Sequence, residues 1–513
     1  MNKIAKKKIV LFSSNTRYVG SPLSLLSITR LLDLKKYDVK IITKNEYSNF
    51  EEEVVKQCEG AVCLGITTIT GFPIKIATRV SQKVKEKYPK LPIIWGGWQP
   101  TTLPEETLKA KFVDYICMGQ GDRAFPKFVE AITSGNLSEL SKIVGLGFKK
   151  GRKIILNPRS AIEDIDNLPD FSLDLINWEK YLEVTDFGKR VIRIYTSYGC
   201  PYRCAFCCEP FNSKRRWKSL SAKRVIGFLI KLKKKVNFDG IIIVDNNFFI
   251  NEQRVIDICK GLIKNKFKIK FGHVNGRTNH LVKYSPEVWK LMKKAGLFNI
   301  LIGAESGNEE TLVFINKDAT VEQTLKLAEI CNKFKILLVA STIVGLPTKK
   351  YFTNSSLAFQ DDLNEVIELY NKICKVGSIH HLLTFFYTPL PFSQLYTKAI
   401  ELGFKPPVGL DNWSDYELSE IHVPWIPKDG FQKVLVLNYI SLVVGIDFKY
   451  LLASVPPYIR IVIKPILEMF KNLGKWRFNS RYLGFPVDMW TFRFGANLFT
   501  AMNKKFRMVN IGG

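Results

Sequence analysis

The chain has 513 residues, too many for one ordinary core, and at roughly 100–200 residues per domain it is expected to form two or three domains. Hydrophobic residues make up 46% of it, which is ample for packed domains, and its ten cysteines show no framework pattern, which excludes a disulfide scaffold and indicates a reducing compartment. The formal net charge of +29 is compatible with nucleic acid, an anionic membrane surface or an acidic substrate. However, lysines are spread along the chain, with only short runs such as Lys231 to Lys235. We therefore expect no nucleic-acid partner and keep peripheral membrane contact as the second interpretation.

Neither a targeting segment nor a membrane span is expected. The basic start of the chain is followed by an apolar run, Ile9 to Phe12, that is far shorter than the ~7–15 residues of a signal-peptide core. The longest apolar stretch, Val434 to Ile446, is interrupted by Asn438 and Ser441 and falls short of the ~18 residues that suggest a transmembrane helix. We therefore expect a cytoplasmic protein.

Residues 1–138 are expected to form a doubly wound, Rossmann-like domain, because short apolar runs alternate with amphipathic segments. The expected strands are 9–12, 39–42, 61–66, 93–95 and 115–118. Ligands of such sheets bind beyond the carboxyl ends of the strands. Those ends are polar or glycine-rich here, and the candidate binding residues among them are Thr67, Thr68, Gly96, Gly97 and Gln120. No G-x-G-x-x-G opens the first helix, so a nicotinamide site is disfavoured.

Turn residues and acidic patches between 139 and 188 indicate a linker, and a second alternating pattern follows in residues 189–400. Its expected strands are 191–197, 240–245, 268–274, 298–303, 336–344 and 382–386. Six such repeats predict a partial (β/α)6 TIM barrel, whose chemistry lies at the carboxyl ends of the strands. The candidate residues on that rim are Asp245, Asn275, Arg277, Glu305 and Ser306. Residues 401–513 contain aromatic and basic segments, such as 458–471 and 482–494, and are expected to form a mainly helical cap that shapes the substrate pocket.

The most informative stretch follows the first strand of the predicted barrel. Cys200, Cys204 and Cys207 have C-x-x-x-C-x-x-C spacing, which lets one loop hold three irons of a four-iron cluster and leaves the fourth iron open. A zinc knuckle needs a fourth ligand from a second knuckle, and a redox pair of Cys204 and Cys207 leaves Cys200 idle, so both alternatives are disfavoured. Cys208 is expected to be a packing residue, because adjacent thiolates rarely reach two corners of one cluster.

Together with this motif, residues 8 to about 420 resemble the cobalamin-binding subgroup of radical SAM proteins. In the N-terminal part the similar loops are Gly96-Gly97-Trp98-Gln99-Pro100 and Gly119-Gln120-Gly121-Asp122, and the linker motif is Asp166-Asn167-Leu168-Pro169. In the barrel they are Thr196-Ser197-Tyr198-Gly199, Arg216-Trp217-Lys218-Ser219, Gly303-Ala304-Glu305-Ser306-Gly307 and Tyr387-Thr388-Pro389-Leu390-Pro391. Two motifs depart from the usual pattern, Asp245-Asn246-Asn247-Phe248 and Gly345-Leu346-Pro347-Thr348.

The resemblance implies three cofactors: a 4Fe-4S cluster on the three cysteines, S-adenosylmethionine (SAM) on its open iron, and cobalamin on the N-terminal sheet. It implies that the cluster cleaves SAM to a 5′-deoxyadenosyl radical, which takes hydrogen from an unactivated carbon, and that methylcobalamin then donates a methyl group. The three cysteines are thus the expected catalytic residues. The five rim residues are expected to bind SAM, and the five residues of the N-terminal sheet to bind cobalamin. An electron donor such as ferredoxin or flavodoxin is the expected partner.

The histidines constrain how cobalamin is held. All five lie at or beyond His273, so the N-terminal domain cannot donate a histidine to cobalt. We therefore expect the lower face of cobalt to be empty, water-bound or met by another side chain such as Arg17 or Gln120.

The sequence is compatible with other functions besides methyl transfer. Ring closure or rearrangement, as in the anaerobic cyclase of chlorophyll biosynthesis, is the alternative to methyl transfer, because fold and motifs do not separate the two. A tRNA methylthiotransferase is less favoured. The N-terminal cysteines of that family hold a second cluster, whereas here Cys63 and Cys117 lie inside strand patterns and Cys58 near a helix end, as core residues do. A non-catalytic cobalamin or cluster sensor is disfavoured by the complete barrel rim. The positive charge and the aromatic C-terminal segments favour a lipid or tetrapyrrole as the small-molecule substrate.

Overall fold

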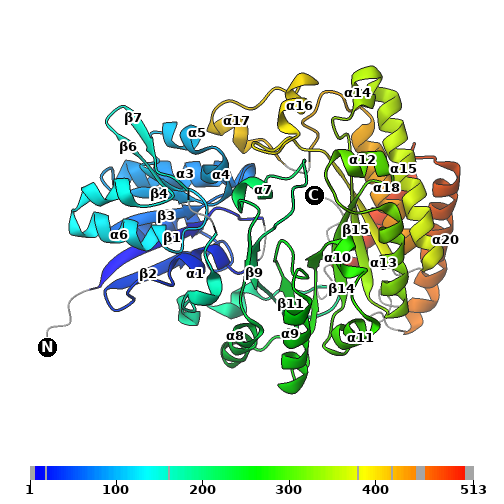
Figure 1. Ribbon diagram of the computed structural model, residues 1–513, viewed down its shortest axis with the longest axis horizontal. Helices are drawn as coiled ribbons and strands as arrows, with labels where there is room; N and C mark the ends of the chain where they lie inside the picture. Colours follow the sequence, from blue (N-terminus) through cyan, green and yellow to red (C-terminus); the bar gives the residue numbers. More distant parts are fainter. Residues whose placement is uncertain are drawn as a thin grey trace.

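The computed structural model describes residues 6–17, 20–159, 162–377, 380–417, 420–445 and 457–502, and in helical residues 457–459 and 495–502 it describes the backbone alone. Two α/β units lie side by side, and helices of the C-terminal part cover the far side of the second unit (Figure 1). Segments 446–456 and 503–513 of the predicted cap lie outside the described residues. None of the described helices has an apolar stretch long enough to cross a membrane.

The N-terminal unit is a seven-stranded sheet in the order β2-β1-β3-β4-β5-β6-β7, parallel from β2 to β5 and antiparallel beyond. Its strands are β1 (Lys7–Ser13), β2 (Tyr37–Ile42), β3 (Ala61–Thr67), β4 (Ile93–Gly96), β5 (Tyr115–Cys117), β6 (Leu146–Lys150) and β7 (Lys153–Leu156). Its helices are α1 (Leu23–Ile28), α2 (Phe50–Gln57), α3 (Phe72–Lys87), α4 (Trp98–Thr102), α5 (Pro104–Lys109), α6 (Ala124–Ser134) and the 3-10 helix η1 (Leu137–Lys142). The order reverses between β1 and β3, and that switch point is where such sheets bind ligands.

The sheet extends past the predicted domain boundary at residue 138. Strands β6 and β7 form a hairpin that adds to β5, so the first part of the predicted linker 139–188 belongs to the N-terminal sheet. The alternation of apolar and polar residues that predicts a strand is weak in this hairpin, because both faces of β7 are partly exposed. The rest of that range contains the short 3-10 helices η2 (Ile165–Asn167), η3 (Leu173–Leu175) and η4 (Trp178–Tyr181).

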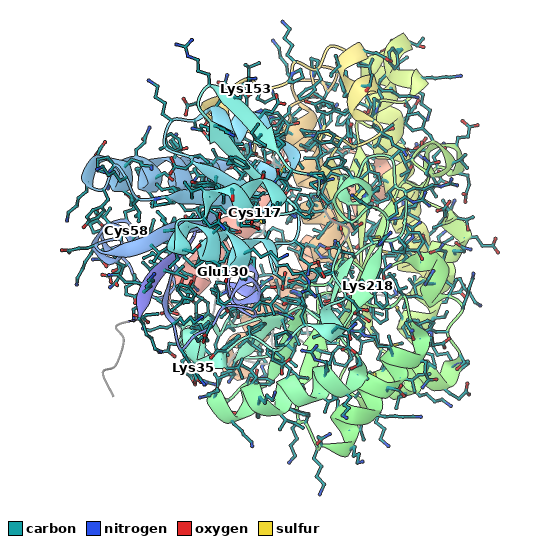
Figure 2. All side chains as sticks on the ribbon, turned by 60° about the vertical axis from the view of Figure 1, so that its left-hand side comes forward. Lys35, Cys58, Cys117, Glu130, Lys153 and Lys218 are labelled. Atoms are coloured by element: carbon teal, nitrogen blue, oxygen red, sulfur yellow. The ribbon has the colours of Figure 1, made fainter. Side chains whose placement is uncertain are left out.

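The cysteines of the N-terminal unit are core residues, as expected. Cys58, Cys63 and Cys117 are buried in three different places of the sheet and its helices, and Figure 2 labels the first and last of them. Burial raises the pKa of the Cys58 thiol to about 12. Lysine side chains, in contrast, project on many sides of the molecule (Figure 2), as the even distribution of lysine predicts.

The second unit is an open barrel of parallel strands in chain order, with six strand positions, one of which is divided into two short strands. Its strands are β8 (Val191–Ile194), β11 (Gly240–Ile243), β12 (Lys270–Gly272), β13 (Val274–Gly276), β14 (Asn299–Glu305), β15 (Leu337–Val344) and β16 (His380–Phe386). The helices that cover it are α8 (Ala222–Lys235), α9 (Glu252–Lys264), α10 (Thr278–Leu281), α11 (Pro286–Lys294), α12 (Glu309–Phe314), α13 (Val321–Lys333), α14 (Lys349–Thr353) and α15 (Ser355–Val376). The predicted partial barrel is therefore present.

One predicted strand, 268–274, is divided into β12 and β13. His273 between them has φ +52, in the left-handed region, so the extended backbone stops there. The side chain of Asn299 lies at the break, where its Oδ1 accepts a hydrogen bond from the His273 N–H. The barrel wall consists of two sheets, β12-β11-β8 and β13-β14-β15-β16. The break separates β12, at the edge of one sheet, from β13, at the edge of the other.

An open barrel has two edge strands, and both are covered. Glu183 of the linker pairs with Val191 at the β8 edge. At the β16 edge, helix α18 (Gly430–Gly445) supplies the missing partners: Asn438 accepts from Thr384 N at 2.7 Å and donates to Thr384 O at 2.9 Å. Ser441 does the same for the backbone of Leu382, at 2.9 and 2.7 Å. The two polar residues that interrupt this apolar run therefore protect an edge that otherwise exposes unpaired backbone groups.

The remaining helices of the C-terminal part are α16 (Tyr396–Glu401), α17 (Leu410–Ser414), α20 (Pro457–Ser480) and α21 (Val487–Met502). α20 lies on α18 on the outer side of the barrel, whereas α16 and α17 lie between the two units (Figure 1).

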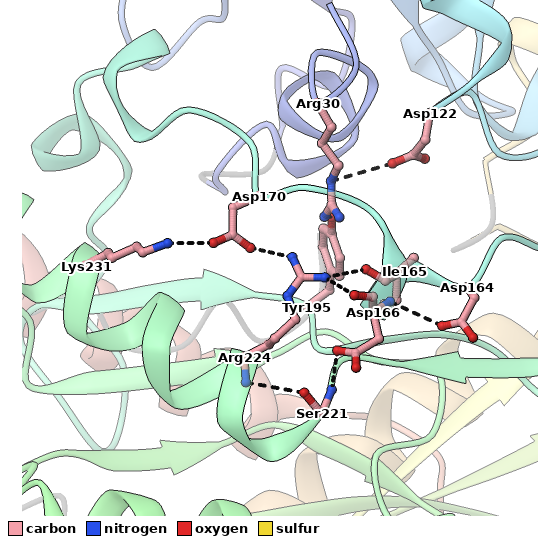
Figure 3. A network of polar contacts seen from close by, with 10 residues as sticks. All are labelled: Arg30, Asp122, Asp164, Ile165, Asp166, Asp170, Tyr195, Ser221, Arg224 and Lys231. Atoms are coloured by element: carbon pink, nitrogen blue, oxygen red, sulfur yellow. Dashed lines mark hydrogen bonds and ion pairs between the residues drawn. The ribbon is translucent and has the colours of Figure 1, made fainter.

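A buried arginine of the N-terminal unit contacts the barrel unit, and an ion pair within its own unit holds it in place (Figure 3). Arg30 Nε lies 3.6 Å from Asp122 Oδ1, and both side chains are 2% exposed. Ser27 Oγ also donates to Asp122 Oδ1, at 2.6 Å. On the barrel side, Arg30 Nη2 donates to the hydroxyl of Tyr195, the residue after β8. The N-terminal unit is thus fastened to the strand that leads into the cysteine loop.

The linker is held by a second set of contacts (Figure 3). Arg224 of α8 donates to the carbonyls of Ile165 and Asp166, at 2.9 and 2.5 Å, and to Asp170 Oδ1 at 2.5 Å. Lys231 donates to Asp170 Oδ2 at 2.8 Å. Burial alone raises the pKa of Asp170, but the hydrogen bonds from Lys231 and Arg224 outweigh it and lower the pKa. The acidic linker is therefore docked on the basic helix α8.

Replacing Asn438 by alanine tests the covered edge. Asn438→Ala leaves the buried N–H and C=O of Thr384 without partners, which costs about 2 kcal/mol. We expect the midpoint of thermal unfolding to fall by roughly 5 °C. Asn472→Ala, at an exposed position of α20, is the matched control and should change the midpoint by less than about 1 °C. Equal midpoints for the two variants would contradict this role.

Candidate active site

The three cysteines lie on a loop between two short strands at the rim of the barrel. β9 (Ser197–Gly199) and β10 (Trp217–Ser219) pair antiparallel, with Gly199 opposite Trp217, and so close the base of the loop 200–216. Gly199 has φ +80, and a Cβ there would lie 2.2 Å from the carbonyl oxygen of Arg216. Glycine is therefore required immediately before Cys200. α7 (Glu209–Asn212) follows the last cysteine of the motif.

Cys200, Cys204 and Cys207 are free and partly exposed, whereas Cys208 is buried. Burial raises the pKa of Cys200, and it raises that of Cys207 to about 12. Among the residues that the structure describes, no three His, Cys, Asp or Glu side chains gather as closely as the ligands of one metal ion. A cluster instead takes each cysteine on a separate iron, so a partly exposed loop with three free thiols fits it.

Arg277 lies against the cysteine loop. Its Nη1 donates to Cys204 Sγ at 3.0 Å, and its guanidinium lies 3.7 Å from the centre of the Tyr202 ring. The side chain is 6% exposed, and Nη2 has no hydrogen-bond partner, although Asp318 lies 3.9 Å away. A buried guanidinium with a free donor fits an anionic group beside the cysteines, because an unpaired buried donor is costly.

Asp245 fastens the strand before the cysteine loop. Its carboxylate accepts from Thr196 N, Thr196 Oγ1 and Ser197 Oγ, each at 2.6 Å. Arg254 reaches the same point, donating to Thr196 Oγ1 at 2.7 Å. The Asn275 side chain donates to the backbone carbonyl of Asp245 at 2.9 Å. Three rim strands are therefore joined where the loop begins, a network that the sequence pattern does not reveal.

Glu305 ends β14 with φ +64, next to a register shift in the pairing with β15. Its Oε1 accepts from Lys317 Nζ at 2.7 Å, and both side chains are 7% exposed. The carboxylate folds back over Gly303, where a Cβ would lie 1.8 Å from Oε1. The neighbouring Ser306 is buried, and its hydroxyl accepts from Asn308 N at 3.1 Å. Lys317 was missed by the sequence analysis, because a single lysine after a short helix carries no pattern.

The candidate cobalamin residues lie at the carboxyl edge of the N-terminal sheet. Thr67 ends β3, and Thr68 N donates to Gly96 O at 2.9 Å. Gly97 has φ +99, and a Cβ there would lie 2.5 Å from Thr68 O. The structure thus brings Thr67, Thr68, Gly96 and Gly97 together, because glycine at 97 lets the two loops approach closely.

Buried polar atoms without partners gather around the same edge. Gln120 Oε1 accepts from Glu163 N at 2.7 Å, but its Nε2 has no partner. Gln99 Nε2, Asn15 Oδ1 and Ser21 Oγ are buried and also lack partners. Buried polar groups are normally satisfied, so these atoms fit a polar ligand at the switch point, such as the amide-rich cobalamin ring. Gln99 belongs to a loop that carries the family resemblance, but neither it nor Asn15 or Ser21 was among the candidate binding residues.

The C-terminal part also reaches this edge. α17 packs on the start of α3, and Gly71 N donates to Trp413 O at 3.1 Å. Glu417 accepts from Phe72 N at 2.8 Å and pairs with Arg17 at 3.1 Å. Arg17, an expected candidate for the lower face of cobalt, is therefore engaged by Glu417 in this structure.

Comparison with known families agrees with this geometry. The family described as "Radical SAM superfamily" matches residues 194–352, which span the cysteine loop and most of the barrel. The chain is thus an enzyme of the radical SAM superfamily. The family described as "B12 binding domain" matches residues 10–129, the N-terminal sheet. The chain therefore belongs to the radical SAM proteins that carry a cobalamin-binding domain, and the predicted family and fold class are confirmed.

Curated relatives have related names. An uncharacterized methyltransferase of Pyrococcus horikoshii is 27% identical, over 82% of this chain and 87% of its own. The anaerobic magnesium-protoporphyrin IX monomethyl ester cyclase of Rubrivivax gelatinosus is 26% identical, over 73% of this chain and 63% of its own. The hopanoid C-3 methylase of Methylococcus capsulatus is 22% identical, over 63% and 60%. The chain thus spans most of the first relative and less than two thirds of the other two.

Two solved structures share the fold. The cobalamin-dependent SAM radical enzyme OxsB, with aqua-cobalamin and SAM bound, has a TM-score of 0.69 at 18% identity, covering 99% of this chain and 77% of that one. The radical SAM methyltransferase TsrM from Kitasatospora setae, with tryptophan and a SAM analogue bound, has a TM-score of 0.63 at 15% identity, covering 78% and 77%.

Replacing Gly97 by alanine tests the cobalamin edge. Gly97→Ala puts a methyl group 2.5 Å from Thr68 O, so the backbone must shift. We expect at least about tenfold weaker uptake of hydroxocobalamin, measured by absorbance after equilibrium dialysis, since each 1.4 kcal/mol of lost binding is tenfold. Gly135→Ala is the matched control: Gly135 also has positive φ, +77, but no atom lies within 4 Å of its Cβ position. Unchanged uptake by Gly97→Ala, or an equal loss in Gly135→Ala, would contradict the assignment.

Proposed function

We propose that this protein is a cobalamin-dependent radical SAM enzyme that methylates an unactivated carbon of a small-molecule substrate. The observation that carries the proposal is the placement of the cysteine loop, which lies between the barrel and the N-terminal sheet (Figure 1). When bound, the cluster supplies the electron that cleaves SAM to a 5′-deoxyadenosyl radical, and cobalamin supplies the methyl group. The methyltransferase names among the relatives support this choice of reaction.

The residues of the chain hold and orient these groups. Cys200, Cys204 and Cys207 would each supply one thiolate to the cluster. Arg277 would stabilise the negative charge of the ligated loop, since it already donates to Cys204. Asp245 would position the base of the cysteine loop, because its carboxylate oxygens accept hydrogen bonds from Thr196 and Ser197 there.

We infer that SAM binds along the rim beside this loop, near Asn275, Glu305 and Ser306. Glu305 would accept from the ribose or the amino group of SAM through the oxygen that Lys317 does not occupy. Cobalamin would lie on the carboxyl edge of the N-terminal sheet, with its tail among Thr67, Thr68, Gly96 and Gly97. Gln120 would donate to it through Nε2, which has no protein partner.

The substrate is proposed to be a lipid or a tetrapyrrole, and the electron donor a ferredoxin or flavodoxin. Three relatives are named as magnesium-protoporphyrin ester cyclases, at 25–28% identity. Because the chain spans 49–64% of their length, ring closure is kept as the second candidate reaction.

Single cysteine substitutions test the cluster assignment. Cys204→Ala removes one of three thiolates, so the anaerobically reconstituted protein should form no measurable 5′-deoxyadenosine from SAM. Cys208→Ala is the matched control, because this neighbouring cysteine is buried outside the motif, and it should retain the cleavage activity. SAM cleavage and a content of about four irons in Cys204→Ala would show the assignment to be wrong.

Isotope labelling tests the reaction. With SAM labelled in its methyl group, mass spectrometry of candidate lipid and tetrapyrrole substrates should show one labelled methyl in the product. S-adenosylhomocysteine and 5′-deoxyadenosine should each appear at about one per product, because one SAM gives the methyl group and another the radical. A product that has lost hydrogens and gained no label would assign ring closure instead.

A further inference from the structure

Helix α20 has two apolar faces, of which the protein covers one. Leu467, Phe470, Gly474 and Phe478 face inward, and the ring of Phe478 stacks on Tyr370 of α15 at 4.8 Å. A second stripe at helical spacing faces solvent and consists of Val462, Ile466, Met469 and Trp476. Figure 1 shows α20 on the outer side of the barrel, away from the N-terminal unit. The exposed stripe therefore takes no part in joining the two units.

The apolar surface continues across the turn into α21. Tyr482 and Phe485 of the turn are exposed, and so are Val487, Trp490 and Phe494, which lie on one face of α21. The rings of Trp476 and Tyr482 lie 5.9 Å apart, and those of Phe485 and Trp490 lie 6.2 Å apart. Exposed fractions of all nine side chains run from 44% to 70%. Contiguous exposed apolar surface of this kind marks an interaction site.

A buried arginine holds the aromatic turn in place. Arg477 forms a bidentate ion pair with Asp488, at 2.9 and 2.6 Å, and both side chains are 5% exposed. Its remaining donors bind the carbonyls of Tyr482, Gly484 and Phe485, at 3.2, 2.8 and 2.8 Å. Phe485 has φ +29, an unfavourable backbone angle for a bulky residue. Such strain persists only where neighbours enforce it, and here the enforced conformation presents an aromatic ring to solvent.

The same segment is strongly basic. Residues 460–494 contain seven lysines and arginines but only two acidic residues, of which Asp488 is engaged by Arg477. Lys464, Lys471 and Lys475 form a stripe along α20 beside the exposed apolar one. An apolar stripe with aromatic residues and a basic flank matches the boundary of an anionic bilayer, where rings enter the interface and lysines meet lipid phosphates.

We propose that the α20–α21 face, defined as the nine exposed apolar side chains and the basic residues of 460–494, docks the enzyme on an anionic phospholipid surface. A second copy of the chain fits this face less well, because a two-fold contact would bring the same positive charges together. The helices would lie on the bilayer rather than cross it, since no described helix is apolar and long enough to span it. The proposal concerns this face alone and does not depend on the reaction at the cysteine loop.

Vesicle sedimentation of the full-length protein tests the proposal. The protein should sediment at low salt with vesicles of phosphatidylcholine containing about one third phosphatidylglycerol, and much less with phosphatidylcholine alone. Salt at about 0.5 M should release it, because the Debye length falls to a few ångströms. Brominated acyl chains should quench part of the tryptophan fluorescence, and Trp476→Phe/Trp490→Phe should lose that quenching.

Two pairs of variants separate the apolar and basic contributions. Phe485→Ser/Trp490→Ser and Lys464→Glu/Lys475→Glu should each weaken vesicle binding at least about tenfold. Val313→Ser/Leu357→Ser, at exposed apolar positions of α12 and α15, and Lys260→Glu/Lys264→Glu on α9 are the matched controls and should bind as the unaltered chain does. All eight side chains are substantially exposed, so unaltered circular dichroism is expected throughout.

Three results would overturn the proposal. The first is that the unaltered protein binds neither vesicle, and the second is that the face variants bind as well as their controls. The third is a concentration-dependent dimer in light scattering that the face variants abolish, which would assign the face to a second copy. None of these results depends on turnover, so failure of the proposed methyl transfer would leave the outcome readable.

Discussion

The contacts of Arg30 are a physical constraint on the arrangement of the two units, because Asp122 of the same unit holds its guanidinium in the core while Nη2 donates to Tyr195 of the barrel unit. A buried ion pair contributes little net stability compared with an apolar contact, but loss of one partner costs about 3–5 kcal/mol because the other charge is left buried alone. Arg30 also donates to Tyr195, two residues before the hairpin that closes the cysteine loop. Asp122 therefore holds Arg30 in the position from which it contacts the strand that leads into the loop. A reaction that uses one cofactor from each unit needs a fixed placement of the two units, since small displacements of reacting groups are costly.

The open barrel imposes a second constraint, because its two edge strands must be satisfied. The linker covers β8, and α18 covers β16 with two polar side chains, Asn438 and Ser441. Side-chain partners thus satisfy the β16 edge without a further strand. α18 is then buried under α20, which leaves the second apolar face of α20 as the outer surface of the protein.

Much of the site was predictable from the chain because its residues follow strands. Parallel strands end at a common edge, so Thr67, Gly97 and Gln120 gather on one sheet and Asn275, Arg277 and Glu305 on the barrel rim, as strand order alone requires. The partners of these residues were not predictable. Lys317 pairs with Glu305, and Thr196 with Asp245, through contacts that bring different rim strands or loops together. The local pattern of apolar and polar residues does not indicate which side chain contacts a carboxylate from a distant part of the chain.

The family, the two α/β units and the three cysteines could be predicted from the chain alone, because hydrophobic periodicity and cysteine spacing are local properties of a sequence. The three-dimensional packing was needed to show that β6 and β7 extend the first sheet, that a strand is broken at His273, and that Asn438 and Ser441 cover an edge. It also decided that Arg477 braces an exposed aromatic turn. Each of these depends on a partner far away along the chain, and such pairing is specified by the shape of the packed protein rather than by any segment alone.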